Sequence, residues 1–406
     1  MTPTMDIKTI EGVMEVLGQR GVDGMADVMR VLLNEAMKLE REEAVKAKSY
    51  ERTPDRLGYA NGFKSKTLNT RLGRMTVQIP QVRGLSFYPK SLEKGCRSER
   101  ALKLAIAEMY VNGVSTRRVS EITEKLCGLD ISSTQVSRLS KVLDEEVKKF
   151  ATRALKRIPY LILDARYERI RVSGCVRDCA VLIATGVNTN GKREVLGVSV
   201  ALSEAEVHWR EFLQSLTARG LHGVEYIVSD SHEGLKAAKK AVFPKAIWQR
   251  CQFHFQQNAQ AYSPKKSMRK EIAQDVRDIF NCANRDDAEL KKMQVIDKYK
   301  DSAPAFSKWL ELNVDETLNA FSLPRSFQVK LRTSNSLENL NREIRRRTQI
   351  ASIFPNVEAC TRLIGAVLVE IHEDWIVRTE NYLNMKDKTD EELKSQTFTI
   401  YRKKVA

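Results

Sequence analysis

With 406 residues the chain is longer than a typical domain of ~100–200 residues, so we expect about two to four domains. Lys and Arg number 68 against 52 Asp and Glu, and the formal net charge of +16 favours a polyanionic partner, either nucleic acid or anionic lipid. No uncharged apolar run nears the ~20 residues that span a bilayer, which argues against a membrane-spanning protein. No signal-peptide pattern is present, and the seven cysteines are irregularly spaced, which argues against a secreted protein held by disulfides. We therefore expect a cytoplasmic protein.

The first predicted element is an amphipathic helix over 24–48. Seven apolar residues recur on one face with the 3.6-residue period of a half-buried helix: Met25, Val28, Met29, Leu32, Leu33, Ala36 and Met37. We assign residues 1–48 to an N-terminal helical region that is a candidate for dimerisation.

A basic segment follows this helix. Between residues 46 and 83, nine basic residues stand against two acidic ones, a local charge of +7, and three aromatic residues are interleaved with them: Tyr50, Tyr59 and Phe63. A short strand with alternating apolar residues, Met75, Val77 and Ile79, is expected to end at Pro80. We interpret residues 49–98 as a basic DNA-binding module with four candidate contacts: Lys64, Lys66, Arg71 and Arg74. A solvated basic face without function has the same composition.

Residues 99–152 carry the pattern of three helices. Breaks are expected at 113–115 and 128–133, where Ser115 and Ser132 or Ser133 are N-cap candidates. In the last helix the buried stripe is predicted to be Val136, Leu139 and Val142, which leaves polar residues free to face a DNA groove: Gln135, Ser137, Arg138 and Lys141. We interpret this region as a helix-turn-helix-like DNA-binding domain, although three-helix bundles that bind nothing share its pattern.

A pattern of alternating strands and helices begins near Pro159. Short apolar runs predict strands over 160–165, 179–186, 194–201, 224–229 and 245–250, with helices over 204–219 and 231–242. This alternation is typical of a mixed sheet covered by helices, so we expect a multidomain α/β protein whose core begins with residues 153–255.

Helical periodicity replaces the α/β pattern after residue 256. Two helices are indicated by buried-face residues, Ile272, Val276, Ile279 and Phe280 in one and Phe306, Trp309, Leu310 and Leu312 in the other, so 256–328 is interpreted as an all-helical insertion. The core resumes over 329–385 and contains a last helix over about 356–384, whose inward residues are Val357, Cys360, Ile364, Val367, Leu368, Ile371 and Trp375. We expect the charged tail, 386–406, to fray.

Two aspartates follow runs that are otherwise apolar. Asp164 follows residues 160–163 and Asp230 follows residues 224–229, so we expect both carboxylates at one edge of the sheet. A buried carboxylate is costly, and two close together repel unless a cation lies between them. Mg²⁺, with Mn²⁺ as its substitute, is the hard cation that oxygen ligands favour.

A third carboxylate lies on a basic helix that residues 333–336 are expected to cap. Leu337, Leu340 and Ile344 form its buried stripe, whereas Glu338 shares a face with Asn341, Arg342 and Arg345. This helix thus offers a metal ligand beside candidate phosphate-binding cations, which are Arg342, Arg345 and Arg346 on the helix and Arg332 just before its cap. The combination suits phosphoryl transfer with two metal ions. Taken singly, Asp164 is also explained as a strand end and Glu338 as an ion-pair partner of Arg342.

The order of Asp on a first strand, Asp after a fourth strand and Glu on a later helix resembles the ribonuclease-H-like core of DDE transposases and integrases. Five strings resemble the mutator-type bacterial insertion-sequence transposases: Tyr59 to Phe63, Leu163 to Tyr167, Asp230 to Leu235, Gln249 to His254 and Asn335 to Thr348. The resemblance spans about residues 24–380, and Leu340 to Thr348 is its most specific part.

This resemblance implies a ribonuclease-H-like catalytic core, interrupted by the helical insertion, in which Asp164, Asp230 and Glu338 are the catalytic ligands of two Mg²⁺ or Mn²⁺ ions. It implies a homodimer that binds double-stranded DNA at the terminal inverted repeats of an insertion sequence and then cuts and joins strands. The expected setting is the bacterial cytoplasm near the nucleoid, and the resemblance favours a copying route through a circular intermediate.

Three further residues are candidates for supporting the active site. Cys251 and His254 have the spacing of half a zinc site, but no second pair with convincing spacing completes it. His254 is expected to approach the scissile phosphate or to brace Asp230; alternatively, it forms a buried structural pair with Cys251. His232 is either a hydrogen-bond partner of a ligand carboxylate or a surface residue at a helix start. Glu343 competes with Glu338 but lies on a different face of its helix.

Two other functions fit the same features. A ribonuclease-H-like nuclease would cut without joining strands. A catalytically inactive regulator would bind DNA through the helix-turn-helix and show no metal-dependent nicking. Serine or tyrosine recombination fits less well, because the strongest motifs present carboxylates and not an activated hydroxyl.

Overall fold

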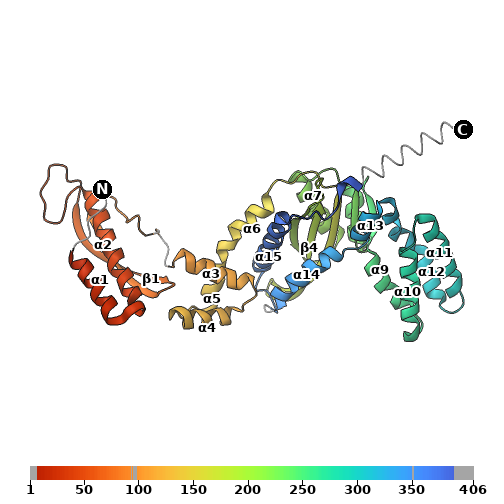
Figure 1. Cartoon of the computed structure of the whole chain (residues 1–406), viewed down its shortest axis with the longest axis horizontal. Coiled ribbons are helices and arrows are strands. Elements are labelled where there is room, and N and C mark those ends of the chain that lie inside the picture. Colours follow the sequence, from red (N-terminus) through yellow and green to blue (C-terminus); the bar gives the residue numbers. More distant parts are fainter. Residues whose placement is uncertain (1–6, 93, 95–97, 350–351, 388–406) are drawn as a thin grey trace. The chain divides into compact units, whose positions relative to one another are not determined.

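The computed structural model describes residues 7–92, 94, 98–349 and 352–387. The chain divides into two compact units, Met1–Val142 and Leu143–Ala406 (Figure 1). Within the described residues, no helix combines the length and the apolar character that crossing a membrane requires. The predicted charged tail lies, from residue 388 onward, outside the described part of the chain.

The first unit begins with two helices and a β-hairpin. Helices α1 (Ile7–Arg20) and α2 (Met25–Val45) are followed by strands β1 (Tyr59–Thr70) and β2 (Gly73–Arg83), which pair antiparallel. Helix α2 packs on the hairpin through a cluster of buried residues: Met37, Met75, Val77, Ile79 and Leu92. The amphipathic helix predicted over 24–48 is therefore confirmed, although Met29 on its apolar face is 38% exposed.

Strand β2 corrects the expectation for Pro80. The strand continues to Arg83, and Pro80 pairs with Phe63 beside a register shift between Ala60 and Phe63. A proline removes one backbone donor, which a two-stranded sheet tolerates because each strand is an edge with outward-facing amides. The sequence pattern does not predict β1, since its first seven residues are all exposed and no apolar face alternates along them.

Three short helices complete the first unit: α3 (Arg100–Val111), α4 (Thr116–Cys127) and α5 (Ser133–Leu139). Both predicted breaks are confirmed, and Ser115 and Ser132 cap α4 and α5; Ser132 and Gln135 form a capping box. The last helix is shorter than predicted. Ser140 Oγ donates to the Val136 carbonyl, a 3₁₀ turn follows over Ser140–Val142, and Val142 is 40% exposed instead of buried.

The second unit is built on a five-stranded mixed sheet with the order β5-β4-β3-β6-β7. Strands β3 (Tyr160–Val172), β4 (Cys175–Val187) and β5 (Arg193–Ala201) are antiparallel neighbours. Strands β6 (Tyr226–Ser229) and β7 (Ile247–Arg250) run parallel to β3. The predicted α/β class is confirmed. Strands β3 and β4 are longer than the apolar runs indicate, because their hairpin extends into exposed and charged residues.

Helices cover both faces of this sheet. Helices α7 (Glu206–Ala218) and α8 (Glu233–Val242) bury one face in a cluster that includes Leu161, Leu163 and Ile227. On the other face lie α14 (Asn335–Thr348) and α15 (Val357–Val377), which contact β3, while α15 also packs on β5 and on α6 (Leu143–Thr152). Asp164 follows Leu163 and therefore points to this second face.

Residues 252–331 form the helical segment, which has a core of its own. Its main helices are α9 (Gln252–Ala259), α10 (Arg269–Phe280), α11 (Arg285–Tyr299), α12 (Pro304–Asn313) and α13 (Arg325–Leu331). Helices α10, α11 and α12 gather side by side (Figure 1). Both predicted apolar faces are found, except that Leu312 is 72% exposed. Leu312 is two residues after Leu310, and residues two apart on a helix do not share a face.

The last helix ends earlier than predicted, at Val377 and not near 384. After it, the chain folds back so that the Leu383 amide donates to the Gly191 carbonyl and the Leu383 side chain is buried. Trp375 and Tyr382 both face the Arg193 guanidinium, at 3.9 and 4.6 Å from the ring centroids. The contacts of Tyr382 and Leu383 hold the residues after α15 against Gly191 and Arg193.

Candidate active site

The sheet brings two predicted aspartates to matching positions. On parallel strands β3 and β6, Tyr160 pairs with Tyr226 and Ile162 with Val228, an offset of 66 residues. The same offset relates Asp164 to Asp230, just beyond the paired segment. Matching residues on neighbouring parallel strands lie on one face, with backbones about 4.8 Å apart. The two carboxylates therefore start from adjacent positions, at the carboxyl end of the segment over which β3 and β6 pair, although β3 itself continues to Val172.

Strand β7 adds a third member to this set. Ser229 pairs with Arg250, and the Cys251 amide donates to the Ser229 carbonyl at 2.7 Å, so Cys251 lies level with Asp230. We call Asp164, Asp230 and Cys251 the carboxyl-end row. Cys251 is fully buried and is the N-cap residue of α9, whose first turn carries His254.

Helix α14 approaches Asp164 from the second face of the sheet, which α14 and α15 cover. Asn341 Nδ2 donates to Asp164 Oδ2 at 2.6 Å, and Arg166 Nη1 donates to the Asn341 carbonyl at 2.8 Å. Burial raises the pKa of Asp164 to about 6, and the neighbouring charge of Asp230 acts in the same direction. His254 and the hydrogen bond from Asn341 oppose this rise. A carboxyl group with this pKa is one that a nearby cation would keep ionised.

A groove runs between β3 and α14, which we call the β3–α14 groove. Its polar lining includes residues from both elements and from α9: Asp164, Arg166, Glu168, Arg169, His254, Glu338, Asn341, Arg342, Arg345, Thr348 and Gln349. Glu338 Oε1, Asn341 Oδ1 and His254 Nδ1 are buried atoms that have no hydrogen-bond partner within the described residues. Such orphaned polar atoms in one groove indicate a site that a polar ligand or cation completes.

The predicted face of α14 is confirmed by this lining. Glu338, Asn341, Arg342 and Arg345 all face the β3–α14 groove, whereas Glu343 pairs with Arg346 at 3.0 Å on the outer side. Leu337, Leu340 and Ile344 are buried as predicted. The alternative pairing of Glu338 with Arg342 is wrong, since Arg342 donates to Asn339 instead. No side-chain cap forms at Ser334, whose hydroxyl is used elsewhere.

Cys251 and His254 interact beside the groove. The Cys251 side chain raises the pKa of His254 to about 9 against the effect of burial, and the carboxylates of Asp230 and Asp164 add to the rise. Burial by itself raises the pKa of Cys251, but interactions with His254 and Ser334 bring it below its usual value. His254 therefore holds a positive charge near the two aspartates. His232, by contrast, is exposed at the start of α8, and Asp230 Oδ1 accepts from the Ser231 amide at 2.7 Å.

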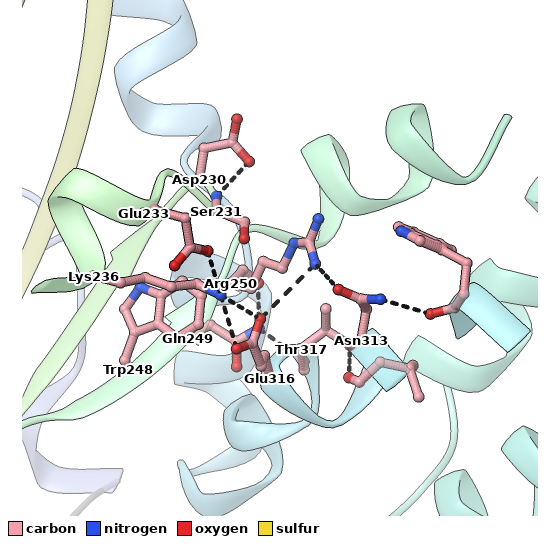
Figure 2. Close-up of polar contacts among 12 residues, drawn as sticks. Asp230, Ser231, Glu233, Lys236, Trp248, Gln249, Arg250, Asn313, Glu316 and Thr317 are labelled. Atoms are coloured by element: carbon pink, nitrogen blue, oxygen red, sulfur yellow. Dashed lines mark hydrogen bonds and ion pairs between the residues drawn. The ribbon is translucent and has the colours of Figure 1, made fainter. Parts of the chain in front are cut away.

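Figure 2 shows the polar contacts that join the helical segment to the sheet and to α8, close to Asp230. Lys236 Nζ donates to both carboxylate oxygens of Glu316, at 2.9 and 3.1 Å, and Arg250 Nη1 lies 3.8 Å from Glu316 Oε2 and 3.3 Å from Asn313 Oδ1. Arg250 is only 5% exposed, and Gln249 Nε2 donates to the Thr317 carbonyl at 2.8 Å. We call these contacts the Arg250–Glu316 seam. They join β7 and α8 to residues 313–317 of the helical segment, where α12 ends.

The remaining predicted DNA contacts are spread over both units. In the first unit, Lys64, Lys66, Arg74 and Gln135 line one groove, while Arg71 pairs with Glu99 at 3.1 Å and Arg138 and Lys141 are exposed. In the second unit, Arg332 donates to Asn281 Oδ1 at 3.0 Å, away from the β3–α14 groove, and Arg346 pairs with Glu343. Their contact with DNA stays a prediction.

Several groove residues are missed by sequence reasoning. Asn341 is placed on the correct face but given no role, and Arg166, Glu168 and Arg169 are not singled out. The available signal is the run of charged residues that continues β3 beyond Asp164. The described residues contain no group of three or more His, Cys, Asp or Glu side chains that is already arranged to hold a metal ion.

Comparison with known proteins identifies the family. The model for Transposase, Mutator family, matches residues 2–378. The chain is 48% identical to the transposase for insertion sequence element IS406 of Burkholderia multivorans over 386 residues, which cover 95% of this chain and 99% of that protein. It is 37% identical to the transposase for insertion sequence element IS256 in transposon Tn4001 of Staphylococcus aureus, over 89% of this chain and 93% of that protein. The chain therefore belongs to the Mutator family of transposases.

Proposed function

We propose that this transposase is a DDE enzyme, in which Asp164, Asp230 and Glu338 hold two Mg²⁺ or Mn²⁺ ions and cut and join DNA strands. One observation carries the proposal: Asp164 and Asp230 start from matching positions on adjacent strands, and Glu338 reaches the groove that Asp164 lines. The orphaned Glu338 Oε1 and the raised pKa of Asp164 both fit a bound cation. Carboxylate oxygens are the donors that these hard ions prefer.

The chain's own residues would position the reacting groups. Asn341 orients Asp164 through its 2.6 Å hydrogen bond, and Arg342 and Arg345, on the same face as Glu338, would hold backbone phosphates. His254 would donate to a phosphate oxygen through Nδ1, which has no other partner within the described residues. When bound, the metal ions would activate the attacking oxygen and stabilise the leaving one.

Two displacements complete the proposed reaction. Water attacks a phosphodiester at the element's end, one P–O bond breaks, and a 3′-hydroxyl is released. That hydroxyl then attacks a second phosphodiester, forming one P–O bond as another breaks. Bond number is conserved in the joining step, so no covalent protein intermediate or external energy source is needed.

The fold features support a ribonuclease-H-like core with a helical insertion. Three antiparallel strands are followed by two strands parallel to β3, and the helical segment lies between β7 and the helix that carries Glu338. In the first unit, α3 to α5 would serve as the helix-turn-helix and the hairpin β1–β2 as a basic DNA-binding module. We further propose a homodimer that recognises terminal inverted repeats and moves its element by a copying route.

The direct experiment combines the purified protein, Mg²⁺ or Mn²⁺, and labelled DNA bearing the element's own ends. Joined DNA ends are the expected product. Cutting without joining, regardless of repeat sequence, would favour a nuclease. Binding without any metal-dependent nicking would favour a regulator and contradict the proposal.

A further inference from the structure

The third position of the carboxyl-end row holds a thiol and not a carboxylate. Cys251 is fully buried, and its Sγ accepts two hydrogen bonds from Ser334, one from the backbone amide and one from Oγ, both at 3.3 Å. Ser334 is also fully buried. A second contact lies alongside, because the Gln252 amide donates to the Arg332 carbonyl at 3.0 Å. These hydrogen bonds thus hold the residues that precede α14 against the corner between β7 and α9.

Ser334 is also hydrogen-bonded to the first turn of α14, which carries Glu338. The Ser334 carbonyl accepts hydrogen bonds from the Leu337 amide at 2.7 Å and from the Glu338 amide at 3.2 Å. A hydrogen-bonded path therefore runs from Cys251 Sγ through Ser334 to the backbone of Glu338. Ser334 is the N-cap residue of α14, yet its hydroxyl bonds the Cys251 sulfur and caps no helix amide. Helix α14 therefore lacks the usual side-chain cap, and its N-cap residue is instead hydrogen-bonded to the residue that follows β7.

We propose that Cys251 is a positioning residue that sets where Glu338 enters the metal site. The inference rests on the proposed function, since it concerns Glu338 as a metal ligand. Cys251 touches neither metal nor DNA in this role; it fixes the start of α14 against the strand next to Asp230. Because Glu338 is in the first turn of α14, a shift at Ser334 would move its carboxylate directly. Loss of a group that hydrogen-bonds a metal ligand typically changes the metal affinity by about 10–100-fold, and Cys251 acts on Glu338 one contact further out, through Ser334.

The test measures Mn²⁺ binding by calorimetry, together with the Mg²⁺ concentration that gives half-maximal strand cleavage. Cys251→Ala removes the acceptor and should weaken Mn²⁺ binding about 10-fold, the lower end of the range for partners of metal ligands. Ser334→Ala removes one of the two donors and should act in the same direction with a smaller effect. Cys251→Ser keeps an acceptor and should restore much of the affinity. DNA binding without metal should be unchanged in all three.

Ser307→Ala is the matched control for loss of a buried serine. Ser307 is 6% exposed, and its Oγ donates to the Ile296 carbonyl at 2.8 Å within the helical segment. It should lower thermal stability without changing Mn²⁺ affinity. If Cys251→Ala does not fold, Ser334→Ala and Cys251→Ser carry the test. Wild-type Mn²⁺ affinity in Ser334→Ala, and in Cys251→Ala where that variant folds, would overturn the inference. Absence of Mn²⁺ binding by the wild-type protein would instead overturn the proposed function.

Discussion

Asn341 links β3 and α14, which carry two of the three candidate ligands. Its amide nitrogen donates to Asp164 from α14, and its orientation is fixed by that bond, since a carboxylate only accepts. Sequence periodicity places Asn341 beside Glu338 on the helix, but the approach of that helix to β3 depends on packing over more than 170 residues of chain. Its contact with Asp164 is therefore visible only in the folded protein.

Replacing Asn341 by Ala should reduce metal-dependent cleavage by about 10–100-fold, because Asp164 loses the partner that orients it. Asn190→Ala is the matched control: Asn190 has the same side chain but is exposed in the turn between β4 and β5. Cleavage rates at saturating Mg²⁺ check the difference. Equal rates for the two variants would remove Asn341 from the site.

His372 should make stability depend on pH. Burial lowers its pKa to about 4, with Arg153 acting in the same direction, and its Nδ1 accepts from the Val195 amide at 3.3 Å. The unfolded chain therefore binds this proton more tightly, so stability is complete above the unfolded pKa of about 6.5 and is lost as pH falls toward 4. At pH 5 the loss is about 2 kcal/mol. His372→Gln should flatten the change in unfolding free energy between pH 7.5 and 5; an unaltered profile would show that other groups dominate.

At the scale of elements, the Arg250–Glu316 seam joins the sheet to the helical segment. Glu316→Ala leaves Arg250 and Lys236 without their shared carboxylate, and Arg250 is buried. The expected cost is about 1–3 kcal/mol of unfolding free energy, limited because Glu316 itself is 36% exposed. Glu271→Ala, which breaks the pair of Glu271 on α10 with Lys298 on α11, is the control and should cost about 1 kcal/mol or less. Urea titration would show whether the two variants differ as expected.

The first-unit groove predicts a measurable salt effect. Lys64 is exposed beside Lys66, Arg74 and Gln135, so Lys64→Ala should remove about one phosphate contact and reduce the slope of log affinity against log salt by about 0.9. Lys270→Ala, an exposed lysine on α10, should leave the slope unchanged. A slope that falls equally in both variants would mean that charge, and not this groove, governs binding.

The sequence predicts elements best where one pattern dominates. The sequence indicates Asp164 and Asp230 because each follows an apolar run, and Glu338 because its helix has a clear buried stripe. Strand β1 escapes prediction because its exposed residues do not alternate, and α5 ends early because the Ser140 hydroxyl competes with the helical hydrogen bonds. The Cys251–Ser334 contact joins residues 83 positions apart, which no local periodicity encodes.

For the whole molecule, the charge of +16 and the division into two units suit a protein that binds DNA at more than one place. The first unit has a basic groove of its own, and the second has the β3–α14 groove lined by arginines and carboxylates. DNA binding and strand chemistry should therefore respond to different substitutions.

The most direct measurement is strand joining on labelled terminal-repeat DNA with Mg²⁺, for Asp164→Ala, Asp230→Ala, Glu338→Ala and the control Glu343→Ala. We expect the first three to lose cleavage and joining while DNA binding persists. Glu343→Ala should stay close to the wild type, because Glu343 pairs with Arg346 outside the β3–α14 groove. Joined products from any of the first three variants at the wild-type rate would contradict the three-carboxylate site.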